Sequence, residues 1–188
     1  MSLAGLLAAV AEDPQLRSAL AASPDLPAGG ERDLVAPSAL RPLLVAALAA
    51  GTVSPDGRGR FVLAVTATAR EAEDLTCALG AFLPPNSVAT FPGWETLPHE
   101  RLSPRSDTVG QRIAVLRRLA HPAAAGDELG GALRVVVAPV RSVLQPIVAG
   151  LGDLEPVRLV AGDDADPEDV ITRLVEIGYA RVDRKSVV

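Results

Sequence analysis

The residue types that most often carry chemistry are scarce in this chain, which has two histidines and one cysteine. His99 and His121 form no HExxH or HxH pattern, so they predict no metal site. Cys77 follows Glu73 and Asp74 at helical spacing, and acidic neighbours disfavour the thiolate that a nucleophile needs. We therefore assign no catalytic residue and no bound metal.

A nucleotide site would need a glycine-rich loop between a strand and a helix, with N–H groups around the phosphates and a lysine against their oxygens. The segment APSALRPLL (residues 36–44) has neither glycine nor lysine, and its prolines remove N–H donors. The glycines of GDELGG (residues 126–131) precede a predicted strand, whereas a dinucleotide fingerprint follows one. We expect no ATP site and no cofactor in this chain.

A basic face is the first candidate for binding. Arginine pairs well with phosphate and carboxylate alike. The periodicity of residues 106–120 predicts a helix, capped by Ser106 and Asp107, whose polar residues point away from the core. A solvated helix face explains the same pattern. The arginines of this candidate face are Arg101, Arg105, Arg112, Arg117 and Arg118.

The second candidate is the loop at residues 91–105, FPGWETLPHERLSPR, which contains the only tryptophan. One interpretation makes Trp94 a hydrophobic plug, with its indole N–H bonded to a backbone carbonyl. The other makes the loop a partner-facing surface, with Trp94, Glu95 and His99 as contacts. The residues alone favour the plug.

Alternating apolar strands and amphipathic helices must position these residues. Strands are predicted at residues 33–36, 61–65, 87–91 and 133–137, with helices between them, which indicates a parallel α/β sheet covered by helices. We divide the chain into a helical lead-in (1–30), the α/β domain (31–151) and an incomplete second α/β domain (152–188). The second domain is predicted to contain a strand at 156–160, a helix capped by Asp166 and a strand at 179–182.

Composition limits the class of protein and the partners that we expect. The chain has 188 residues, of which 48% are hydrophobic and only 3% aromatic, so Ala, Val and Leu must build the core. A net charge of −5 argues against binding nucleic acid with the whole surface. No apolar run reaches the roughly 18 residues of a membrane span. We expect a cytoplasmic protein without membrane contact.

Four separated motifs resemble one known family in order and spacing. They are FPGWETLPHERLSPRSDTVGQRIAVLRRLAH (91–121), TATAREAEDL (66–75), RVVVAPVRSVLQP (134–146) and RLVEIGYARVD (173–183). Together they are similar to the N-terminal module of bacterial transcription-repair coupling factors (Mfd), above all the actinobacterial ones. The resemblance covers nearly the whole chain.

The resemblance implies a module like the excision-repair protein UvrB: a degenerate helicase-type domain without a phosphate loop, then a UvrA-binding domain. The family displaces stalled RNA polymerase at DNA lesions and recruits UvrA for nucleotide excision repair. ATP, Mg and double-stranded DNA belong to a downstream motor that this chain lacks. UvrB's long aromatic hairpin is replaced here by the compact loop, so gripping of damaged DNA is not expected.

The family's UvrA-binding residues lie downstream of the GYxxVD strand, so none is carried onto this chain. Its end, RKSVV, reads as a truncation or a frameshift. We therefore predict a non-catalytic protein-interaction module that is poorly stable alone, with an open sheet edge. Two alternatives stay open: an ATP-dependent helicase-like domain with an atypical nucleotide site, and an adaptor that binds nucleic acid through the arginine face.

Overall fold

The computed structural model describes residues 3–20, 31, 33–52, 59–96, 103–122 and 132–179. The chain divides into two compact units, Met1–Gly152 and Asp153–Val188. The strands are β1 (Val62–Thr66), β2 (Val88–Thr90) and β3 (Val135–Pro139). The α-helices are α1 (Ala4–Glu12), α2 (Pro14–Leu20), α3 (Arg41–Ala50), α4 (Ala69–Leu79), α5 (Ser106–Ala120), α6 (Val140–Leu144) and α7 (Pro167–Glu176). Short 3₁₀ turns cover Ser38–Leu40 and Leu151–Asp153.

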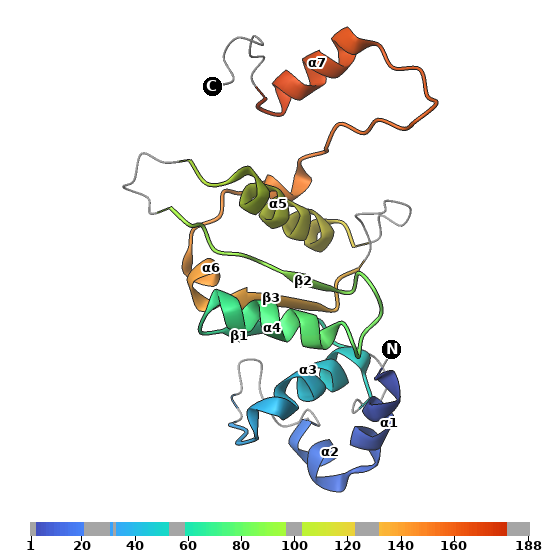
Figure 1. Cartoon of the computed structure of the whole chain (residues 1–188), viewed down its shortest axis with the longest axis vertical. Coiled ribbons are helices and arrows are strands. Elements are labelled where there is room, and N and C mark those ends of the chain that lie inside the picture. The colour runs from blue at the N-terminus through green and yellow to red at the C-terminus, as the bar shows by residue number, and fades with distance from the viewer. Residues whose placement is uncertain are drawn as a thin grey trace. The chain divides into compact units, whose positions relative to one another are not determined.

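The three strands form a parallel sheet in the order β1-β3-β2 (Figure 1). Val135 of β3 lies opposite Val62 on one side and Val88 on the other, which fixes the register. All five residues of β3 are buried, as expected for a parallel strand covered on both faces. The predicted fold class, an α/β sheet covered by helices, is confirmed.

Alternation along β3 divides the interior of the first unit into two cores. Val135 and Val137 point into the core that also contains residues of α3 and α4, among them Leu79. Val136 and Ala138 point to the opposite face, where α5 contributes Val115. Figure 1 shows α4 and α5 on opposite sides of the sheet. The buried residues of α3 are all alanines, as expected for a chain with few aromatic residues to fill its core.

Local signals fix several helix ends as the sequence predicts. The Asp13 carboxylate accepts the N–H groups of Gln15 (2.8 Å) and Leu16 (3.0 Å) at the start of α2. Gly51 ends α3 with a φ of 76°, a left-handed conformation that glycine adopts at little cost. In the second unit, Asp166 caps α7 by accepting the N–H of Glu168 at 2.9 Å.

Two predicted strands are wrong. Residues 33–36 are irregular, because Pro37 follows at once and the apolar side chains Leu34 and Val35 are exposed without a pairing partner. Residues 156–160 are also irregular, and the described part of the second unit has no other strand to pair with them. The strand predicted from Tyr179 lies almost entirely outside the described residues.

The second unit has little to hold it together in the part that the structure describes. None of residues 153–179 is buried. α7 leaves Val175 exposed, and Leu159 and Tyr179 are exposed as well. No helix in the described ranges is long and apolar enough to cross a membrane.

The capping box of α4 gives a first prediction. Thr68 accepts the N–H of Glu71, and Glu71 accepts the N–H of Thr68. Replacing a capping threonine by alanine removes the acceptor for a helix N–H group, so Thr68→Ala should lower the free energy of unfolding by about 1 kcal/mol. Urea denaturation measures it. Glu73→Ala, on the exposed side of the same helix, serves as control and should stay within about 0.5 kcal/mol of the parent.

Candidate interaction surface

The loop that follows β2 begins inside the protein. Phe91 is buried in the core beneath α5, and its N–H donates to the Val137 carbonyl at 2.8 Å, which extends the ladder between β2 and β3. Trp94, three residues later, is half-buried. The loop therefore leaves the carboxyl end of the sheet from a fixed point.

An amide side chain from α6 holds the backbone of Trp94. The Trp94 N–H donates to Gln145 Oε1 at 2.7 Å, and Gln145 Nε2 donates to the Trp94 carbonyl at 3.3 Å. Gln145 directly follows α6, which is tied to the end of β3 because the buried Ser142 hydroxyl donates to the Pro139 carbonyl at 2.8 Å. The loop after β2 and the helix after β3 are thus joined by two hydrogen bonds.

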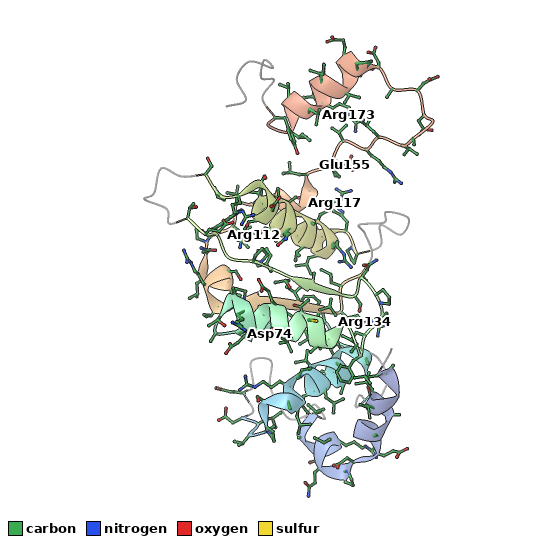
Figure 2. All side chains as sticks on the ribbon, viewed as in Figure 1. Asp74, Arg112, Arg117, Arg134, Glu155 and Arg173 are labelled. Carbon is green, nitrogen blue, oxygen red and sulfur yellow. The ribbon has the colours of Figure 1, made fainter. Side chains whose placement is uncertain are left out.

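Arg112 is the central residue of the site, and its predicted orientation is wrong. It was expected to point away from the core, but only 2% of its surface is exposed. The guanidinium carbon lies 4.1 Å from the ring centroid of Phe91 and 4.3 Å from that of Trp94. Its Nη1 donates to the Pro92 carbonyl at 2.6 Å. In Figure 2 the side chain lies on the sheet side of α5.

The buried charge is tolerated because its neighbours match it. Burial lowers the pKa of Arg112, yet a guanidinium in a protein stays protonated because its ordinary pKa is so high. The negative faces of two aromatic rings attract the cation. The planar, weakly hydrated guanidinium also loses less on leaving water than a lysine ammonium would. The ring of Trp94 thus stacks on Arg112, and its backbone is held by Gln145.

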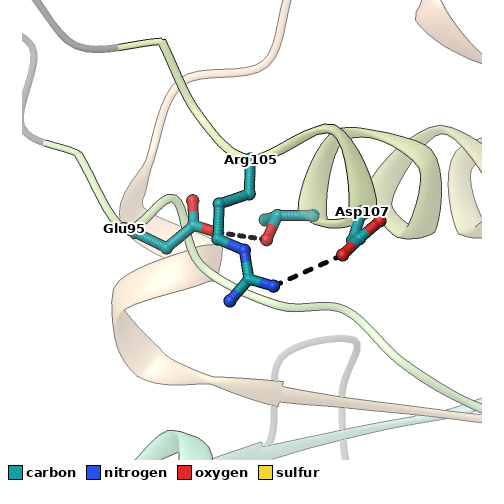
Figure 3. Close-up of polar contacts among 4 residues, drawn as sticks. Glu95, Arg105 and Asp107 are labelled. Carbon is teal, nitrogen blue, oxygen red and sulfur yellow. Dashed lines mark hydrogen bonds and ion pairs between the residues drawn. The ribbon is translucent and has the colours of Figure 1, made fainter. Parts of the chain in front are cut away.

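Glu95 links the same loop to the start of α5 (Figure 3). Its carboxylate accepts the Thr108 hydroxyl, and this bond is the main reason that its pKa is lowered from 4.5. The predicted caps, Ser106 and Asp107, do not cap the helix, because α5 begins after Arg105 without a side-chain bond at the N-cap. Glu95 supplies the negative charge that a helix N-terminus favours.

The other arginines of the candidate face that the structure describes lie in different surroundings. Arg105 pairs with Asp107 at 3.4 Å, but both side chains are 74% exposed, so the pair contributes little. Arg118 donates to the Asn86 carbonyl, and partial burial lowers its pKa. Arg117 is half-buried. His99 and Arg101 lie outside the described residues.

Sequence reasoning missed two partners in this arrangement, Gln145 and Thr108. Neither belongs to a chemical motif, and each lies far along the chain from the residue that it holds. Only the pairing of β2 with β3 brings Gln145 to Trp94. In the ranges that the structure covers, no group of histidine, cysteine and carboxylate residues is arranged to hold a metal, and Cys77 is exposed.

Comparison with known proteins identifies the family. A stretch of 160 residues, 83% of this chain, is 51% identical to the transcription-repair-coupling factor of Mycobacterium bovis, and the same figures hold for that of Mycobacterium tuberculosis. The chain belongs to the transcription-repair-coupling factor family. It spans about 12% of the length of these two relatives.

A more distant transcription-repair-coupling factor, from Bacillus subtilis, is 28% identical over 149 residues, which are 78% of this chain and 11% of that protein. No family model matches the chain. The motif-based resemblance to transcription-repair coupling factors is thereby confirmed.

The stacked guanidinium gives a second prediction. Arg112→Met keeps the length of the side chain but loses the cation–π contacts and the bond to Pro92, so the free energy of unfolding should fall by about 2 kcal/mol. The fluorescence of Trp94, the only tryptophan, reports the transition during denaturation. Arg105→Met removes only exposed charge interactions, with Asp107 and Glu95, and should change stability by less than about 0.5 kcal/mol. Equal losses in the two variants would contradict the role of the stack.

The Glu95 bond gives a third prediction, on pH. A carboxylate with a lowered pKa stabilises the fold above its unfolded pKa, and this contribution disappears as the pH falls through the lower, folded pKa. A carbon-13 NMR titration of the Glu95 carboxyl should give a midpoint below 4.5. Thr108→Val, which removes the hydroxyl donor, should raise that midpoint, whereas Thr172→Val on α7 should not. An unchanged midpoint in Thr108→Val would show that the hydroxyl is not the cause.

Proposed function

We propose that this chain is a non-catalytic interaction module of a transcription-repair-coupling factor and that it hydrolyses no ATP by itself. In the intact protein, the proposed role is to help displace RNA polymerase stalled at DNA lesions and to recruit UvrA for nucleotide excision repair. Membership of the family supports this proposed role of the intact protein. The junction between β1 and α4 supports the absence of nucleotide chemistry.

That junction is where a strand passes into a helix at the carboxyl edge of the sheet, the usual place for a phosphate in α/β proteins. Here the N–H groups of Ala67 and Thr68 point to Glu71 Oε2, at 3.0 and 3.4 Å. The Glu71 N–H donates to the Thr68 hydroxyl at 3.2 Å. Three N–H donors of this junction are therefore satisfied internally, and a carboxylate adds a negative charge that repels a phosphate. This is the observation on which the proposal chiefly rests.

The start of α5 supports the same conclusion. Glu95 places a second carboxylate there, with a pKa held low by Thr108, so it is ionised at neutral pH. Glu71 thus accepts backbone N–H groups at the start of α4, and Glu95 accepts the Thr108 hydroxyl in the first turn of α5. An acidic edge of this kind opposes the binding of a triphosphate.

The interaction role follows from the way the loop is fixed. A rigid surface binds a partner at a lower entropic cost than a surface that must first become ordered. Trp94 and Glu95 are held from three sides, by Gln145, Arg112 and Thr108. We assign the contact surface of the module to this loop. The proposed partners of the intact protein are UvrA, RNA polymerase and double-stranded DNA, with the UvrA-binding residues outside these 188 residues.

The fourth prediction tests the catalytic part. The purified chain, incubated with ATP, Mg²⁺ and double-stranded DNA, should release phosphate no faster than a blank without protein, because no phosphate cradle is available. The full-length factor of Mycobacterium tuberculosis is the positive control. A thermal melt with and without the non-hydrolysable analogue AMP-PNP should show no shift.

Phosphate release above the blank, or a rise in melting temperature that depends on the concentration of AMP-PNP, would overturn the proposal and favour an atypical nucleotide site. Glu71→Gln is a matched variant for that case. If a nucleotide bound at the start of α4, removing the carboxylate charge should strengthen binding, whereas binding elsewhere should not respond.

A further inference from the structure

The first unit ends in a short segment with two glycines, AGLG (residues 149–152). The second unit begins with the next residue, Asp153. A segment rich in small residues between two units has the composition of a flexible linker. The surroundings of the two glycines differ, however, and they indicate a separate role for each.

Gly150 is required by the backbone, whereas Gly152 is required by space. Gly150 has a φ of 85°, in the left-handed region, and a Cβ atom there would meet nothing within 4 Å. Gly152 has no left-handed φ. A Cβ atom at Gly152 would lie 2.9 Å from the Leu116 carbonyl oxygen and 3.1 Å from Ala120 Cβ. We call this close approach of Gly152 to Leu116 and Ala120 the Gly152 contact.

The α5 side of the Gly152 contact cannot give way easily. The Leu116 carbonyl belongs to the main chain of α5, so it cannot turn aside as the end of a long side chain can. The helix itself is fixed on the sheet, because Val115 is buried and Leu116 packs against the same core. A larger residue at position 152 would therefore push the outgoing chain off α5.

The same ridge of α5 also holds the candidate interaction loop. Side chains four positions apart form a ridge along a helix, and one ridge of α5 consists of Thr108, Arg112, Leu116 and Ala120. Thr108 donates to Glu95, and Arg112 stacks on the ring of Trp94. At 1.5 Å per residue, the ridge is about 18 Å long. The loop is fixed to one half of this ridge, and the chain leaves the first unit from the other half.

We propose that Gly152 is a positioning residue. It docks the outgoing chain on α5, and the helix thereby holds the origin of the second unit at a constant distance from the loop that contains Trp94. A fixed origin shortens the free segment before the second unit, which raises the local concentration of that unit near a partner bound at the loop. The contact role of the loop rests on the proposed function, but the fixed distance does not.

Nitrogen-15 relaxation measures whether the chain is docked. In the parent protein, the backbone order parameters of residues 151–153 should be about 0.85, as in α5, and in Gly152→Ala they should fall below about 0.6. Gly110→Ala is the matched control, because it lies on the same helix and its added Cβ atom meets nothing within 4 Å. It should leave residues 151–153 rigid. Low order parameters in the parent, high ones in Gly152→Ala or low ones in Gly110→Ala would each overturn the proposal.

Residual dipolar couplings test the constant distance. The N–H couplings of Trp94, of α5 and of residues 151–153 should fit a single alignment tensor in the parent protein. In Gly152→Ala, residues 151–153 should no longer fit, while Trp94 should still fit together with α5. If Trp94 also departs from the tensor of α5, the helix gives way instead of the outgoing chain, and the proposal fails. Neither measurement involves a nucleotide or a partner, so its failure would leave the proposed function untouched.

Discussion

A single buried cation joins the elements of the candidate site. The Arg112 guanidinium comes from α5, lies against a ring from the end of β2 and a ring from the following loop, and donates to the carbonyl between them. Removing a charge from water is expensive unless its surroundings replace the lost hydration. Here the faces of Phe91 and Trp94 and one carbonyl do so. Helix, strand end and loop are therefore mutually dependent, because each is needed to shelter the same charge.

The sheet beneath this cluster organises the packing of the rest of the first unit. Its central strand is apolar on both faces, so one strand organises two separate cores. One core combines the alanines of α3 with leucines and valines from the neighbouring elements, and its one aromatic neighbour, Phe82, is only partly buried. The other contains Phe91 and borders the loop. The loop is thus attached to the sheet through a core, and its geometry follows from the packing below it.

The sequence correctly predicts those features that neighbouring residues determine. Asp13, Gly51 and Asp166 act where expected, because a cap is set by a few neighbouring residues. Tertiary contacts decide the failures. Residues 33–36 have strand-like composition, but a strand forms only with a partner. Arg112 lies on the same helix face as Val115 and Leu116. The apolar pattern of the helix nevertheless places a charged residue outside the core. Nothing in the neighbouring sequence indicates that two aromatic rings pack over that face. Gln145 was missed for the same reason.

The two hydrogen bonds between Gln145 and Trp94 have a further consequence. An amide side chain that binds both the N–H and the carbonyl of one residue imitates a neighbouring strand, and glutamate would repel that carbonyl. These bonds close the carboxyl edge of the sheet, where many α/β proteins place a small molecule. The groups that fill this part of the edge belong to the protein itself and are always present beside it. The anchor of the Trp94 backbone is consequently intramolecular, and it forms in the same folding event that pairs β2 with β3.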